Sequence, residues 1–370
     1  MSHTPWPRRI PRAMIVYYAG LAVFLATTAM HIPDGYLSPI TSIIMFALVL
    51  PFWWIGLRQL RQKADAGSIP LIALMAAFSF VIMMFNVPLP GGTTGHAVGA
   101  ALAAIILGPE IATVAVSIAL IIQAFFFGDG GILAIGANCF NMAVVIPYLS
   151  YYIYRAISGS SPVTSRRRLV GVAVGGWTGV TVAAFLAGVE FGIQPLLFHT
   201  ADGAPLYAPY PLAVAIPAMV IPHALVASVI EGGLSALVVA YLQRTNPALL
   251  EAREAPAATA QAATFGKLKW LWAGLAVLVI ASPLGLLAPG TAWGEWGTDQ
   301  LAELGINSVP QGMAQLSTLW GAPLADYDLP ALGNANVGYV LSAVVGIIVV
   351  GLVVWLFTVL LTRTSTRASQ

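Results

Sequence analysis

This sequence contains very few charged residues. Asp, Glu, Lys and Arg make up 8% of its 370 residues and hydrophobic residues 59%, whereas soluble domains carry about 25% charged residues. Apolar runs of about 18 or more residues recur along the chain, each long enough to cross a bilayer as a helix. The composition predicts an all-α, polytopic integral membrane protein surrounded by the lipid bilayer, with no role in binding nucleic acid.

Cysteine and lysine are also rare. The single Cys139 excludes an internal disulfide framework and a cysteine-cluster metal site. None of the three lysines follows the glycine pattern of a G-x-x-x-x-G-K-[ST] loop, so this chain does not hydrolyse ATP by that mechanism. The H-E-x-x-H motif of zinc proteases is missing too. We therefore expect a protein that is not an enzyme and holds no permanent cofactor.

The amino-terminal segment, residues 1–29, has the pattern of a secretory signal peptide. Three arginines precede an apolar run over 13–26, and Thr27-Thr28-Ala29 then supplies small residues before a break. Two alternatives are an uncleaved signal anchor and a translation start at Met30. Cleavage and a start at Met30 both make Met30 the first residue of the mature chain.

Basic residues indicate how the chain crosses the membrane. If Met30 lies outside, all 16 Lys and Arg fall in inner loops or in the amino-terminal region that starts inside, and the outer loops carry only acids. We therefore expect the mature amino terminus outside and the carboxyl terminus in the cytoplasm of a cell membrane. The nine expected membrane segments are 40–57, 69–86, 97–107, 111–127, 140–154, 169–190, 212–242, 268–288 and 337–361.

Two histidines flank the first two of these segments. His31 follows Met30, and a free amine, the His31 backbone nitrogen and its imidazole can close fused five- and six-membered chelate rings around one metal ion. His96, after the Gly91–Gly95 stretch, is the natural fourth nitrogen. Planar nitrogen donors suit Ni(II) and Cu(II), with Co(II) possible, and binding would release protons, so affinity should fall in acid. The alternative for His96 is a helix-capping or hydrogen-bonded core residue.

Other polar residues near these histidines are candidates for supporting roles. Asp34 either orients an imidazole or stays solvated at a helix start. Asn138 and Asn141 either hold the metal loop or make interhelical hydrogen bonds. Glu231 is either a helix-packing partner or a contact toward a cytoplasmic partner. His223, in a predicted membrane segment, is assigned to packing. His199 is assigned to an exposed loop.

The motifs together resemble the CbiM/NikM family, the substrate-capture components of energy-coupling-factor transporters for cobalt and nickel. The resemblance covers residues 30–245 and rests on MHIPDGYLSP (30–39), GGTTGHAVG (91–99), LGP (107–109), GGILAIGANCFNM (130–142) and Glu231-Gly232. It implies that the mature amine of Met30, the backbone nitrogen and imidazole of His31, and His96 bind the metal. It also implies a membrane coupling protein and cytoplasmic ATPase subunits as partners.

The carboxyl-terminal part resembles a second module. Residues 246–267 are Ala-rich with scattered charges and predict a cytoplasmic linker. Residues 268–370, two spans around an outer loop, are similar to the PDGLE-type module related to CbiN/NikN, through Ser282-Pro283, Trp293–Trp296 and Asp326–Pro330. Thr291–Glu295 departs from the literal PDGLE pattern.

The sequence thus predicts a substrate-binding component of an ATP-driven importer for divalent cobalt or nickel. Two alternatives belong to other classes: a stand-alone secondary metal carrier, and an intramembrane metal-dependent enzyme. Few membrane-buried acids are available to couple an ion gradient. Both metals accept nitrogen donors, and the family resemblance leans only slightly to cobalt.

Overall fold

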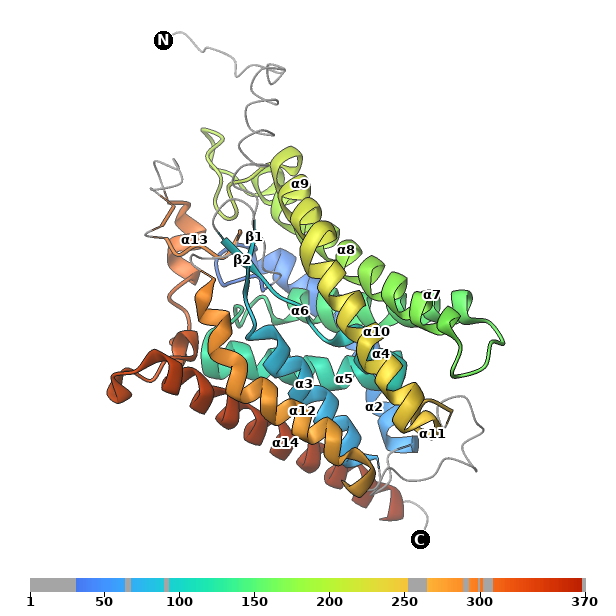
Figure 1. Cartoon of the computed structure of the whole chain (residues 1–370). Coiled ribbons are helices and arrows are strands. Elements are labelled where there is room, and N and C mark those ends of the chain that lie inside the picture. Colours follow the sequence, from blue (N-terminus) through green and yellow to red (C-terminus); the bar gives the residue numbers. More distant parts are fainter. Residues whose placement is uncertain are drawn as a thin grey trace, which may run out of the picture.

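A computed structural model describes residues 31–63, 68–89, 93–251, 265–288, 293–298, 300–301 and 309–367. The predicted signal segment 1–29 and Met30 lie outside these ranges, as does most of the predicted linker 246–267. Within the described ranges the chain is mostly helical, with one short hairpin of strands β1 (Val87–Leu89) and β2 (Thr93–Gly95) (Figure 1).

Six helical runs among the described residues are long and apolar enough to cross a membrane: 39–62, 109–127, 166–197, 212–245, 268–287 and 335–357. They confirm the predicted class of an all-α, polytopic membrane protein. The helices concerned are α2 (Pro39–Lys63), α5 (Pro109–Ile122) with η1 (Gln123–Phe127), α8 (Arg166–Leu197), α9 (Leu212–Pro222) with η3 (His223–Ala227) and α10 (Ser228–Thr245), α12 (Phe265–Ala281) with η5 (Ser282–Leu287), and α14 (Ala335–Arg367).

The three other predicted segments have different forms. Segment 69–86 is the shorter helix α3 (Ile69–Met83). Segment 140–154 lies in a continuous helical run made of α6 (Ile135–Asn138), the π-helical stretch η2 (Cys139–Val145) and α7 (Ile146–Ser158). Segment 97–107 contains only α4 (Ala100–Leu107). At 1.5 Å per residue α4 extends about 12 Å, less than half of a hydrocarbon core of about 30 Å, so it does not cross alone. The total of nine crossings stays a prediction.

Helix α5 lies at the centre of the bundle, with 78% of its apolar window buried. In another part of the bundle, α8 packs against α7, α9 and α10. The contact of α7 with α8 depends on small residues, because a Cβ at Gly175 would lie 2.6 Å from the carbonyl oxygen of Ser150. Glycine at this position therefore lets the two helices approach closely.

The carboxyl-terminal part forms an outer layer of the bundle. Its helices α12 and α14 both pack along α3 (Figure 1), and only 22% and 28% of their apolar windows are buried. The short helices between them are α13 (Gln311–Leu316), η6 (Ala325–Tyr327) and η7 (Pro330–Leu332). The predicted linker 246–267 overlaps two helices, α11 (Pro247–Glu251) near its start and the first residues of α12 at its end. Helical structure therefore extends into both edges of the range that composition predicted as a linker.

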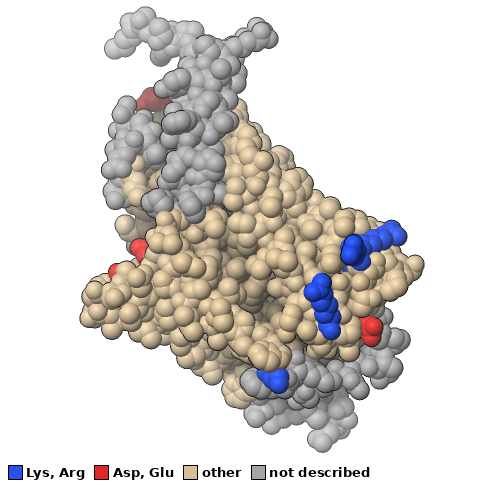
Figure 2. Space-filling view, in the orientation of Figure 1, with Lys and Arg blue, Asp and Glu red and all other residues tan. Residues whose placement is uncertain are grey.

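Charged side chains are separated along the long axis of the molecule. Figure 2 shows Lys and Arg gathered toward the end where α7 and α11 lie, and most of the visible acidic side chains toward the opposite end. The separation agrees in direction with the bias expected across a membrane.

Candidate metal centre

The first described residue, His31, is held in place by a segment about a hundred residues further along the chain. The backbone nitrogen of Ile32 donates to Oδ1 of Asn138 (2.8 Å), and Nδ2 of Asn138 donates back to the Ile32 carbonyl (3.1 Å). Gly131 donates its backbone N–H to the same carbonyl (2.9 Å). Asn138 thus behaves as a strand partner for the residue next to His31, and its role at a metal site stays a prediction.

Asp34 supports the same segment through backbone contacts. Its carboxylate accepts hydrogen bonds from the backbone nitrogens of Ile132 (2.9 Å) and Leu133 (2.8 Å), just before α6. Burial raises the pKa of Asp34, and these N–H donors offset part of the rise. Ser38 then caps α2, since its Oγ accepts from the backbone nitrogen of Thr41 at 3.1 Å. Among the described residues, Asp34 therefore fixes main chain and does not orient an imidazole.

His96 reaches the site on extended backbone that ends at α4. Glu231 of α10 accepts hydrogen bonds from three backbone N–H groups at the start of α4, those of Val98 (2.8 Å), Gly99 (2.8 Å) and Ala101 (2.9 Å). Non-helical backbone at membrane depth needs such partners inside the protein. Of the two roles predicted for Glu231, these contacts favour that of a helix-packing partner, because they join α10 to the start of α4. Glu231 thereby positions the chain that carries His96.

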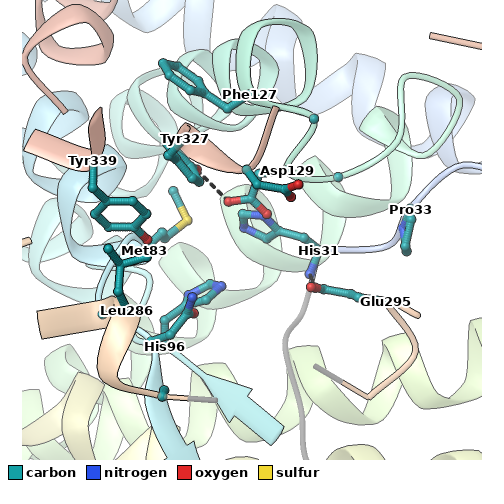
Figure 3. A pocket seen from close by; sticks show the side chains of 16 residues that line it. His31, Pro33, Met83, His96, Phe127, Asp129, Leu286, Glu295, Tyr327 and Tyr339 are labelled. Carbon is teal, nitrogen blue, oxygen red and sulfur yellow. Dashed lines mark hydrogen bonds and ion pairs between the residues drawn. The ribbon is translucent and has the colours of Figure 1, made fainter. Parts of the chain in front are cut away.

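The two predicted histidine ligands lie against each other. Their ring centroids are 5.0 Å apart at an interplanar angle of 71°, and His31 and His96 are only 1% and 4% exposed. Both line a cavity of about 350 Å³, into which Figure 3 shows them facing. Nε2 of His31 is buried without a hydrogen-bond partner among the described residues, and His96 directs Nδ1 at the carbonyl of Ala97 (3.1 Å). Residues 65 apart in sequence are thus brought into one site.

Two carboxylates that sequence reasoning did not assign to the site contact His31. Asp129, after η1, is hydrogen-bonded through Oδ1 to Nδ1 of His31, and Oε1 of Glu295 accepts from the His31 backbone nitrogen (3.1 Å). Asp129 lies between glycines, in Gly128–Gly131, and Glu295 lies in Trp293–Trp296. Nothing local in either stretch identifies a partner for a distant histidine.

The electrostatics of the site leave the His96 imidazole neutral. Burial, and next the neighbouring His31 ring, lower the pKa of His96 to about 4, so at neutral pH a ring nitrogen retains its lone pair. Burial alone would raise the pKa of Asp129, but its charge interaction and hydrogen bond with His31 bring it below the usual value. Burial, and then the nearby Asp129, raise the pKa of Glu295 well above the usual range.

The other predicted polar residues lie outside the cavity. Asn141 donates to Oε2 of Glu190 in α8 (3.0 Å) and is not among the residues that line the cavity. His223 directs Nδ1 at the carbonyl of Met219 (2.7 Å) within its own helical run, and His199 is exposed. Within the ranges described here, no three His, Cys, Asp or Glu side chains converge closely enough to hold a metal ion by themselves.

A family model describing the cobalt uptake substrate-specific transmembrane region, CbiM, matches residues 31–249, which include His31, His96, Asp129 and Glu231 but not Glu295. The chain belongs to the CbiM family. A second model, the PDGLE domain, matches residues 267–363, so this CbiM-family chain carries a PDGLE domain after its CbiM region, as its sequence resemblance indicated.

Several characterised relatives of this CbiM-family chain share one or both regions. The fused nickel transport protein NikMN of Rhodobacter capsulatus is 50% identical over 332 residues, 86% of this chain and 94% of that one. The cobalt transport protein CbiM of Geobacter sulfurreducens is 32% identical over 252 residues, 65% of this chain and 68% of that one. A crystal structure of a transition metal transporter aligns with a TM-score of 0.55 at 48% identity, covering 58% of this chain and 92% of that one.

The PDGLE region completes the wall of the cavity. Tyr327 donates to Oδ2 of Asp129 (2.6 Å) and accepts from Nε2 of Gln123 (2.9 Å), while Tyr339 donates to the carbonyl of Met84 (2.9 Å). Figure 3 shows both tyrosines on the side of the cavity opposite Glu295. The candidate centre is therefore bounded by the CbiM region and by the PDGLE region together.

Replacing Glu231 with Gln should weaken metal binding by about 10- to 100-fold, the range found when residues that support a ligand are removed. The amide retains one acceptor oxygen but turns an NH₂ group toward backbone N–H donors, so the entry into α4 and the position of His96 loosen. Titration of the purified protein with Ni²⁺ and with Co²⁺ measures the change. Glu251→Gln, at an exposed position on α11, is the control, and equal affinities for the two variants would contradict the positioning role.

Proposed function

We propose that this CbiM-family chain is the substrate-binding membrane component of an ATP-driven energy-coupling-factor importer for divalent nickel or cobalt. The observation that carries the proposal is the contact between two buried histidines, His31 and His96, on the wall of a polar cavity in a membrane protein. Ionisable groups are costly at membrane depth and are commonly functional there. Imidazoles are ligands that suit nickel and cobalt.

The proposed ligand set is the amine of Met30, the backbone nitrogen and imidazole of His31, and His96. His31 lines the cavity, and its backbone nitrogen donates to Glu295, which lines the same cavity. A chelate from the mature amino terminus would use this nitrogen together with the imidazole ring. Two of the four nitrogens would then come from main chain. The metal is the cargo, and the chain's role is to take it up at the outer face and pass it on.

ATP hydrolysis would be supplied by partner subunits. This sequence contains no G-x-x-x-x-G-K-[ST] loop, and the family resemblance implies cytoplasmic ATPases and a membrane coupling protein. We propose that these partners meet the end of the molecule where Lys and Arg gather, which would be the cytoplasmic end if the usual bias holds (Figure 2).

We propose nickel, rather than cobalt, as the preferred transported ion. The relative from R. capsulatus shares both the CbiM region and the PDGLE region with this chain and is a nickel transport protein. The relative from G. sulfurreducens, a cobalt transport protein, has lower identity and a shorter match. The slight preference for cobalt drawn from the sequence alone is therefore replaced by a preference for Ni²⁺, and both ions should be measured.

His96→Ala should lower the affinity for Ni²⁺ by more than about 100-fold, because loss of a direct ligand should exceed the 10- to 100-fold cost of losing a supporting residue. Isothermal titration of the detergent-purified chain measures the affinity. His199→Ala, at an exposed loop position, is the matched control. High-affinity binding that persists in His96→Ala would overturn the proposed four-nitrogen site.

Protein purified from its native membrane should begin at Met30, because only a free amine there can act as the first ligand. Intact mass measurement with amino-terminal sequencing tests this. A chain that still carries residues 1–29 while it binds Ni²⁺ tightly would remove the amine from the ligand set and require another donor.

The orientation in the membrane predicts which loops react from outside. Ser160→Cys, between α7 and α8, should be protected from a membrane-impermeant maleimide on intact cells, whereas Asp202→Cys, between α8 and α9, should react. Both positions are exposed, and the native Cys139 is fully buried and should give little background. The opposite labelling pattern would reverse the proposed topology.

A further inference from the structure

Both atoms that His31 would offer to a chelating metal are already hydrogen-bonded to carboxylates. A chelate that joins the backbone nitrogen and the ring of one histidine must use Nδ1, since Nε2 lies on the far side of the ring. In this structure Nδ1 contacts Asp129, and the backbone nitrogen donates to Glu295. A metal entering the proposed site has to displace both contacts.

The PDGLE region controls both carboxylates. Glu295 belongs to it directly, and Asp129 is held by the hydroxyl of Tyr327 at 2.6 Å. The main chain of Asp129 is anchored by its backbone N–H, which donates to the carbonyl of Gln123 (3.2 Å). The hydrogen bond from Tyr327 to Oδ2 fixes the side chain as well, and so helps to keep the other carboxylate oxygen, Oδ1, against the ring of His31.

Tyr327 is itself firmly placed. Its ring stacks on Phe127 with centroids 4.7 Å apart and an angle of 18°, and Oγ of Ser342 donates to its carbonyl (2.9 Å). Its segment is joined to η1 where the backbone nitrogen of Leu324 donates to the carbonyl of Phe126 (2.9 Å). Tyr327 adopts a φ of +59°, a conformation that non-glycine residues rarely keep unless the surroundings impose it.

We propose that the PDGLE region competes with the metal ion for His31. Glu295 holds the backbone nitrogen, and Tyr327 holds the ring through Asp129, so the chain rests in a state in which the chelating atoms are occupied by carboxylates. This inference rests on the proposed function and adds to it a device that sets how tightly the cargo is held. Tyr327 is a positioning residue, since it acts through Asp129.

The same contacts are also compatible with the opposite effect on metal affinity, in which they strengthen binding. A carboxylate that accepts from one nitrogen of a histidine commonly orients the other nitrogen toward a metal, and Nε2 of His31 has no partner among the described residues. In that case Tyr327 would assist binding. The two effects change the affinity for Ni²⁺ in opposite directions, so the single substitution Tyr327→Phe separates them.

Tyr327→Phe should bind Ni²⁺ about 3- to 10-fold more tightly than the unchanged chain, the factor that corresponds to one net hydrogen bond. Phenylalanine keeps the stacking on Phe127 and removes only the hydroxyl. Tyr339→Phe is the matched control, because its hydroxyl borders the same cavity but donates to Met84. The absorption bands of bound Ni²⁺ should be the same in all three proteins, since the competing contacts exist only before the metal binds.

Equal affinities for Tyr327→Phe and Tyr339→Phe, or weaker binding by Tyr327→Phe, would overturn the competition. Glu295→Ala, which removes the other contact, should also bind more tightly and serves as the second variant if Tyr327→Phe does not fold, as judged by thermal unfolding without metal. Binding of Ni²⁺ by the unchanged chain, and its loss in His96→Ala, tests the proposed function separately. If the unchanged chain does not bind Ni²⁺, or if His96→Ala binds it equally well, the metal site itself is refuted.

Discussion

The architecture depends on how unpaired backbone is satisfied in a bilayer. A peptide N–H without a partner in hydrocarbon costs several kcal/mol, so a chain cannot begin a helix halfway across unless the protein supplies acceptors. Here the carboxylate of Glu231 receives three backbone N–H groups at the start of α4. Extended chain therefore reaches the depth at which His96 meets His31. Without that carboxylate the residues before α4 would have to become helical or move toward water.

A second constraint concerns the carboxylates that face the two histidines. A cavity that binds a metal through nitrogen atoms must also be stable when no metal is bound. Asp129 and Glu295 provide partners for the atoms of His31 in that state, and Tyr327 ties one of them to the PDGLE region. Fusion of the two regions in one chain keeps Glu295 and Tyr327, which belong to the PDGLE region, at a high effective concentration beside the site.

Sequence reasoning singled out those candidate residues that have local signals. His31 and His96 stand out because histidines beside Pro- and Gly-rich backbone are unusual in an apolar chain, and the structure brings their rings together. Asp34 and Asn138 were also singled out, and both hold the His31 segment. Asp129, Glu295 and Tyr327 were missed because their contacts join residues 98, 264 and 198 positions apart, and no periodicity or spacing encodes such a pairing.

Composition alone determined that this protein is helical and membrane-embedded, because apolar runs of this length and frequency are stable only in lipid. Short motifs determined the family and the two histidines. Only the tertiary structure decided that α4 is a short helix, that Glu231 supports it, and that the PDGLE region forms part of the cavity wall. Each of these depends on which helices pack together, and helix contacts in a membrane are set by shape and by a few hydrogen bonds, which leave almost no trace in hydrophobic pattern.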